Sequence, residues 1–216
     1  MPTDTPLSAY DRPSVAVDLV LMTVSDGALR VLLQRHESLG WVLPGGIVRV
    51  EEPLEATVAR VLAEKAHLPG AFVEQLYTFG AIGRDPRGRV ISVAYYALVP
   101  AERLAAALAQ SPDLILAAVL KGRAQAPGGL GYDHPEIVRV AAERLAAKLD
   151  YTAIALELLP DEFTLRALQD VYETILDVRL AKPAFRRKML DRGFLKSTGR
   201  FETGGAHRPA ELYVRA

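Results

Sequence analysis

Alternating apolar and polar positions predict strands at the start of the chain. Residues 14–23 are rich in β-branched side chains that alternate around Asp18, and residues 29–35 repeat this pattern. The Asp26-Gly27 dipeptide between the two segments is typical of a tight hairpin turn. We therefore predict a β-hairpin here.

Apolar residues that recur every three to four positions predict a helix at residues 53–66. Pro53 stands near its first turn, and one side of the helix is apolar. The loop motif Leu43-Pro44-Gly45-Gly46 precedes it. Two more strands are predicted at residues 73–79 and 90–99, and two more helices at residues 101–110 and 135–149. Because strands and helices do not alternate regularly, the pattern favours an α+β fold with a mixed sheet over a doubly wound one.

The pattern changes near Leu159-Pro160, where we place a domain boundary. Thr164 is suited to be the N-cap of a following amphipathic helix. The apolar stripe of that helix consists of Leu165, Leu168, Val171, Tyr172 and Ile175.

A second, basic helix is predicted at residues 182–192, with Phe185, Met189 and Leu190 facing inward and Gly193 ending it. Two short strands, at residues 194–197 and 211–214, then flank a Gly204-Gly205 tip. A helix, a short turn, a basic helix and a two-stranded wing are the parts of a winged helix-turn-helix.

Charge distribution supports this division. The chain has 26 basic and 26 acidic residues, but residues 179–216 alone carry a net charge of +7 and the rest −7. A concentrated positive charge suits a polyanionic partner such as DNA, because each neutralised phosphate releases counterions. A solvated basic surface without a partner is the alternative.

Composition excludes several kinds of site and of protein. The chain has no cysteine, which excludes disulfides, thiolate zinc sites and a cysteine nucleophile. The N-terminus does not have the pattern of a signal peptide, and no stretch reaches the roughly 20 apolar residues of a membrane span. We expect a soluble cytoplasmic protein with no membrane partner.

The helix at residues 53–66 carries a recognisable motif. The positions that form it are Gly46, Glu52, Arg60, Leu62, Glu64 and Leu68, preceded by Trp41, Leu43, Pro44 and Gly45. This spacing resembles the Nudix box, in which helix glutamates coordinate a divalent metal that activates water and holds a pyrophosphate.

The box departs from the Nudix pattern where the chemistry resides. Val61 and Lys65 replace two glutamates and His67 replaces a glycine, so Glu64 is the one box carboxylate left within the helix and the single candidate metal ligand. An ammonium group at Lys65 repels Mg²⁺. We therefore expect no catalytic residues, no required cofactor and at most weak Mg²⁺ binding, with a Nudix hydrolase of nucleoside diphosphate derivatives as the alternative.

The same region supplies candidate ligand-binding residues, each with a simpler structural interpretation. Lys65 can act as a tethered cation for a ligand's pyrophosphate, whereas Arg60 and Glu64 can form an ordinary i, i+4 ion pair. The arginine-rich loop at residues 84–89 can bind an anion or be a solvated turn, and Asp133-His134 can be a helix N-cap or a ligand contact. The candidates are Glu52, Arg60, Glu64, Lys65, Arg84, Arg87, Arg89 and His134.

Besides the box, further short sequence segments, spread over most of the chain, carry a family resemblance. They are Val17-Asp18-Leu19-Val20-Leu21, Arg84-Asp85-Pro86-Arg87-Gly88-Arg89, Asp133-His134, Tyr151-Thr152, Leu158-Leu159-Pro160, Phe163-Thr164-Leu165, Leu168-Gln169, Val171-Tyr172-Glu173, Phe185-Arg186-Arg187-Lys188 and Arg208-Pro209-Ala210-Glu211-Leu212-Tyr213. Together with the degenerate box, they resemble the NrtR-type family of Nudix-related transcriptional regulators of NAD metabolism.

The resemblance implies a Nudix α/β/α sandwich at residues 1–158, followed by a winged helix-turn-helix at residues 159–216. It also implies a homodimeric repressor that binds double-stranded operator DNA and senses ADP-ribose or a related nucleotide or sugar phosphate. The residues it assigns to DNA are Lys182, Arg186, Arg187, Lys188, Arg192, Lys196, Arg200 and Arg208. Two alternatives stay open: a hydrolase whose tail serves dimerisation, and a ligand-binding protein without a DNA role.

Overall fold

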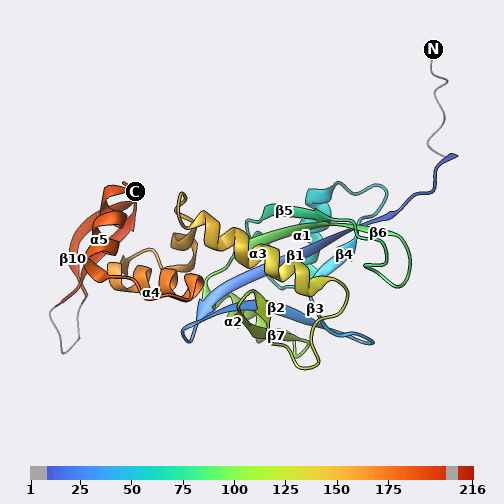
Figure 1. Cartoon of the computed structure of the whole chain (residues 1–216), viewed down its shortest axis with the longest axis horizontal. Helices are drawn as coiled ribbons and strands as arrows, with labels where there is room; N and C mark the ends of the chain where they lie inside the picture. Colours follow the sequence, from blue (N-terminus) through green and yellow to red (C-terminus); the bar gives the residue numbers. More distant parts are fainter. Residues whose placement is uncertain (1–8, 203–208) are drawn as a thin grey trace, which may run out of the picture.

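The computed structural model describes residues 9–202 and 209–216 and has two parts (Figure 1). A large mixed sheet with helices on both faces forms the first part, and a smaller unit with two helices and a short sheet forms the second. Within the described residues, the helices are too short or too polar to cross a lipid bilayer.

The first part contains the strands β1 to β8 and the helices α1 to α3. In chain order they are β1 (Ser14–Ser25), β2 (Ala28–His36), β3 (Gly40–Val42), β4 (Gly45–Ile47), α1 (Leu54–Glu64), β5 (Glu74–Phe79), β6 (Val90–Leu98), α2 (Ala101–Leu108), β7 (Leu114–Leu120), β8 (Arg123–Ala124) and α3 (His134–Lys148).

Strand β1 lies at the centre of the sheet, whose order is β5-β6-β1-β2-β7-β8, with β3 beside β2 and β4 beside β1. It pairs in parallel with β6 and antiparallel with β2, so the sheet is mixed as predicted. Asp26 and Gly27 both have positive φ, 50° and 68°, as a tight hairpin turn requires. The predicted hairpin is confirmed.

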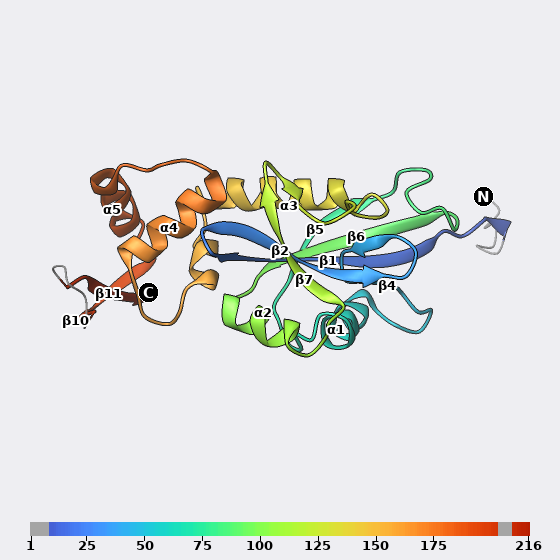
Figure 2. The ribbon, with the colours of Figure 1, turned by 90° about the horizontal axis from the view of Figure 1, so that it is seen from below.

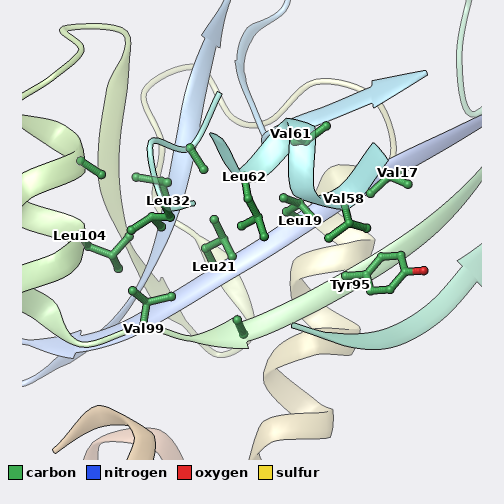
Figure 3. Packing of buried hydrophobic residues seen from close by; sticks show 14 of the residues in the cluster. Val17, Leu19, Leu21, Leu32, Val58, Val61, Leu62, Tyr95, Val99 and Leu104 are labelled. Atoms are coloured by element: carbon green, nitrogen blue, oxygen red, sulfur yellow. The ribbon is translucent and has the colours of Figure 1, made fainter. Parts of the chain in front are cut away.

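Both faces of the sheet are covered, which explains why β1 is apolar on both sides. Val17, Leu19 and Leu21 pack against α1 and α2 (Figure 3), whereas Val20 and Met22 belong to the cluster under α3. Figure 2 shows α1 and α2 on one side of the sheet and α3 on the other. The result is the predicted α/β/α sandwich.

The second part comprises the C-terminal elements. They are the 3₁₀ helix η2 (Ile154–Leu158), β9 (Phe163–Thr164), α4 (Leu165–Leu176), α5 (Lys182–Asp191), β10 (Leu195–Phe201) and β11 (Glu211–Arg215). The strand order β10-β11-β9 adds a third strand to the predicted two-stranded wing. The Gly204-Gly205 tip lies outside the described residues.

Local chemistry sets the ends of these two helices. The Thr164 hydroxyl accepts a hydrogen bond from the Ala167 N–H, so the predicted N-cap is confirmed. Gly193, which follows the C-cap residue Arg192 of α5, has φ of 69°, a conformation that favours glycine. Leu190, predicted to face inward, is instead 46% exposed, because Phe185 and Met189, one turn apart, form the buried face of α5.

Candidate ligand pocket and nucleic-acid interface

A pocket of about 210 Å³ lies where the loop after β3, the end of α1 and the start of α3 meet the central sheet. Its wall combines cationic, acidic and aromatic side chains. The residues relevant to its chemistry are Asp18, Lys65, Arg84, Arg87, Tyr132 and His134.

Arg84 is the centre of a buried ionic network in this wall. Its guanidinium donates to both carboxylate oxygens of Asp133, at 2.8 and 2.6 Å, and to Asp18 at 3.2 Å. The Arg84 side chain is only 4% exposed. Although burial alone would lower it, the two carboxylates raise the Arg84 pKa above its ordinary value.

Asp18 is the buried acceptor of this network. Besides Arg84 it accepts from the Ser92 hydroxyl at 2.6 Å, and the His134 Nε2 atom lies 3.4 Å from its other oxygen. Burial acts to raise the Asp18 pKa, but the hydrogen bonds of His134 and Ser92 and the positive charge of Arg84 outweigh it, so the pKa is lowered. Asp18 therefore stays ionised and holds three partners in place.

His134 connects this network to the loop before the box. Its Nδ1 atom accepts the Leu43 N–H at 2.8 Å, so the proton of the neutral ring resides on Nε2, facing Asp18. Asp133 occupies the N-cap position of α3, but its carboxylate binds Arg84 and no helix N–H. Asp133 is thus the N-cap residue, as predicted, but its side chain does not cap the helix.

Lys65 also lies in the pocket wall. Its Nζ atom donates to the Gly45 carbonyl at 2.5 Å, and burial followed by repulsion from Arg60 lowers its pKa. Gly45 is required here, since a Cβ atom at this position would lie 2.3 Å from the Asp18 carboxylate. Val61, one turn before Lys65, is fully buried against the sheet rather than in the pocket (Figure 3).

Glu52 and Arg60 bind each other outside the pocket wall. Arg60 donates to both Glu52 oxygens at 2.8 and 2.7 Å, and the Thr57 hydroxyl donates to Glu52 at 2.8 Å. These hydrogen bonds, that of Arg60 first, lower the Glu52 pKa to about 2. The expected i, i+4 pair of Arg60 with Glu64 is thus wrong, because Arg60 reaches back to the loop before α1.

The donor groups do not suit a divalent cation. Glu64 is exposed and outside the pocket wall, and Glu52 is engaged by Arg60. Among residues 9–202 and 209–216, no three histidine or acidic side chains are grouped closely enough to hold a metal ion. Lys65 places an ammonium group at the pocket instead, so the pocket presents a positive charge to an anion.

The three arginines of the arginine-rich loop have different roles. Arg84 is anchored as described, and Arg87 pairs with Asp85 at 2.9 and 2.7 Å while its guanidinium lies 5.5 Å from the Tyr132 ring centre. Arg89 instead donates to the carbonyls of Gly80 and Ala81, at 2.8 and 3.1 Å, and does not line the pocket. Two of the three arginines therefore reach the pocket.

Of the six pocket residues named above for their chemistry, Asp18 and Tyr132 were not proposed as ligand contacts from the sequence. Asp18 carried a usable signal, because it is a single acidic residue within an otherwise apolar strand. Tyr132 carried none, since a tyrosine in a loop is ordinary, although its φ of 56° holds the ring toward His134, 5.2 Å away between ring centres.

The exposed face of α5 carries the free positive charge of the second part. Lys182, Arg186 and Arg187 are exposed on α5, and Lys196 is exposed on β10. Within the described part of the chain, no acidic side chain lies within ion-pair distance of these four residues. They are available to an anionic partner.

The remaining cations proposed for DNA have partners within the chain. Lys188 contacts Asp150 at 3.3 Å, and Arg200 forms an ion pair with Glu162. Arg192 donates to the Leu149 carbonyl at 2.9 Å and lies over the Phe194 ring. Arg208 falls outside the described residues.

The first part of the chain is a Nudix-type sandwich with an anion pocket, and the second part is a winged helix whose second helix is basic. These features define the chain as a Nudix-linked winged-helix protein. Two known domain families match the two parts of the chain. The NUDIX domain matches residues 12–120, and the NrtR DNA-binding winged helix domain matches residues 155–214. The chain belongs to the NrtR family.

Individual proteins are similar over nearly the whole chain. The ADPR responsive transcriptional repressor NtrR of Acinetobacter baylyi is 35% identical over 215 residues, which cover 95% of this chain and 83% of that protein. The crystal structure of Shewanella oneidensis NrtR with a 27mer DNA has a TM-score of 0.81 and 36% identity, covering 94% of this chain and 93% of that one. The NUDIX domain of that NrtR, in complex with ADP ribose, has a TM-score of 0.52 and 34% identity, covering 66% of this chain and 94% of the domain.

Proposed function

We propose that this protein is a transcriptional repressor that binds operator DNA through α5 and the wing, and releases it when ADP-ribose or a related nucleotide occupies the pocket. The observation that carries the proposal is the pairing of a pocket suited to an anion with an exposed basic helix in one chain. The similar repressor of Acinetobacter baylyi responds to ADPR, and the similar Shewanella protein was crystallised with DNA.

The pocket chemistry suits a pyrophosphate ligand. Lys65 and Arg87 present cations to the pocket, and Arg84 stands behind them with its charge balanced by Asp18 and Asp133. Charge-assisted hydrogen bonds from such groups are about twice as strong as neutral ones. The proposal therefore includes binding without a metal and without efficient hydrolysis.

The proposal has further parts that follow from a DNA-binding role. We propose a homodimer, since two winged helices related by a two-fold axis match a palindromic operator. In this proposal, residues 1–158 form the sensor and residues 159–216 form the DNA-binding domain. The similar repressor is from a bacterium, where operator DNA lies in the cytoplasm, and we propose the same location for this protein.

A mobility-shift experiment with the DNA upstream of the protein's own gene cluster tests the proposal. We expect a complex whose affinity falls with increasing salt and which ADP-ribose dissociates, with NAD and sugar phosphates tested alongside. Two results contradict it. Turnover of ADP-ribose with Mg²⁺ or Mn²⁺ at roughly one per second or faster, without DNA binding, identifies a hydrolase. Ligand binding without any salt-sensitive DNA affinity identifies a sensor of another kind.

The role of Lys65 in ligand binding is tested by Lys65→Glu in metal-free buffer. Loss of a charge-assisted hydrogen bond and gain of a repelling carboxylate should weaken ADP-ribose binding at least about tenfold by calorimetry. Because the variant restores a box glutamate, added Mg²⁺ should recover part of the affinity. Lys121→Glu, an exposed lysine outside this pocket, is the control. Unchanged affinity in Lys65→Glu would show that the ammonium group does not contact the ligand.

A further inference from the structure

Helix α3 connects the pocket to the winged helix. It runs along the sheet toward α4 in Figures 1 and 2. Its 15 residues span about 22 Å at 1.5 Å per residue. Its first residue, His134, lines the pocket, and Leu149, directly after its last residue, belongs to the apolar cluster of the winged helix.

The pocket end of α3 is held by ionic contacts that an anionic ligand can disturb. Asp133, immediately before α3, takes two hydrogen bonds from the Arg84 guanidinium. Arg84 lines the pocket. An anion entering there competes with Asp133 for the same guanidinium, because both are acceptors of its N–H groups.

The other end of α3 is held by Tyr172 of α4 and by Arg192, the C-cap residue of α5. The Leu149 carbonyl accepts hydrogen bonds from the Arg192 guanidinium at 2.9 Å and from the Tyr172 hydroxyl at 3.2 Å. Arg192 follows α5 directly. The Leu149 side chain is fully buried in the same cluster as Phe185 and Met189 of α5.

Between its ends α3 is packed along its length. Ile137, Val138, Ala141 and Leu145 are fully buried against the sheet. A close-packed helix shifts as one body by an ångström or two rather than bending locally, since interiors deform little. A displacement at Asp133 therefore reaches Leu149.

We propose that α3 transmits pocket occupancy to α5, and that Arg192 is the positioning residue that makes this connection. The inference rests on the proposed function, in which the pocket ligand releases DNA. The family resemblance implied that Arg192 contacts DNA, whereas in this inference Arg192 fixes the position of α5 relative to α3. Arg192 acts through the Leu149 carbonyl and does not touch ligand or DNA.

The test uses full-length Arg192→Met and Tyr172→Phe, with Arg166→Met as a control because Arg166 is exposed on α4 and pairs with Asp170. The measured quantity is the ratio of operator Kd with saturating ADP-ribose to operator Kd without it. A wild-type ratio of about 5 to 150 is typical of allosteric coupling. Arg192→Met should lower this ratio at least threefold, and Tyr172→Phe should lower it less, while the control leaves it unchanged.

The reciprocal measurement separates coupling from mere structural damage. By linkage, the ratio of ADP-ribose Kd with and without DNA must fall by the same factor in each variant, whereas ADP-ribose affinity without DNA stays within about twofold of wild type. Tyr172→Phe keeps the ring that packs on Phe185, so it tests the idea even if Arg192→Met does not fold.

Three results overturn the inference. An unchanged ratio in folded Tyr172→Phe and Arg192→Met shows that the contact carries no coupling. Loss of DNA affinity in Arg192→Met with an unchanged ratio shows that Arg192 contacts DNA. A wild-type ratio of one overturns the proposed function itself, and the inference with it.

Discussion

Replacing Arg84 with methionine is expected to lower the free energy of unfolding by about 3–5 kcal/mol, because the change leaves two carboxylates without their shared cation. Asp18 is buried and Asp133 is mostly buried, so neither can regain full hydration. Chemical denaturation followed by circular dichroism measures the loss. The difference from wild type should narrow as the pH falls, because Arg84 helps to lower the pKa of Asp18 and this buried carboxyl group therefore takes up a proton at a higher pH in the variant than in wild type.

The matched control is Arg87→Met in the same loop. Its side chain is 64% exposed and pairs with one buried carboxylate, that of Asp85, whereas Arg84 is buried between two carboxylates, so the free energy of unfolding should fall by less than in Arg84→Met. If Arg84→Met kept wild-type stability and lost only ADP-ribose affinity, Arg84 would contact the ligand without anchoring the pocket wall.

Periodicity predicted most of the fold because most elements bury one face. Helices α1, α4 and α5 show this pattern, and each lies within two residues of its predicted start. Strand β7 was missed, since its sequence Leu-Ile-Leu-Ala-Ala-Val-Leu has no polar position to show alternation. Strand β9 was missed because two residues carry no period, and only pairing with β11 defines it.

The sequence indicated which segments form the pocket but not how their charges are paired. Lys65 and Arg84 were predicted from the box and from an arginine-rich loop. The partners of Arg84 are 49 and 66 residues away, and the Leu149 carbonyl that holds Arg192 is 43 residues away. A backbone carbonyl has no sequence signature. Arg192 therefore looked like its basic neighbours on α5 until the fold placed Leu149 beside it.

Removing two charges from α5 should have the largest effect on DNA binding. In Arg186→Ala, Arg187→Ala, two exposed guanidinium groups are lost, and alanine maintains the helix. If each neutralises one phosphate, the slope of log affinity against log salt becomes shallower by about 1.8. At physiological salt of about 0.15 M this corresponds to a loss of operator affinity of about 30-fold, measured by fluorescence anisotropy across a salt series.

Arg103→Ala separates this effect from a general change in charge. Arg103 is exposed on α2, in the sensor part of the chain, and its removal should leave both the affinity and the salt slope unchanged. ADP-ribose binding to the double variant should also match wild type, because Arg186 and Arg187 lie outside the pocket wall. A salt slope equal to that of wild type would mean that the exposed face of α5 does not meet the phosphate backbone, and the DNA surface would have to be sought elsewhere on the chain.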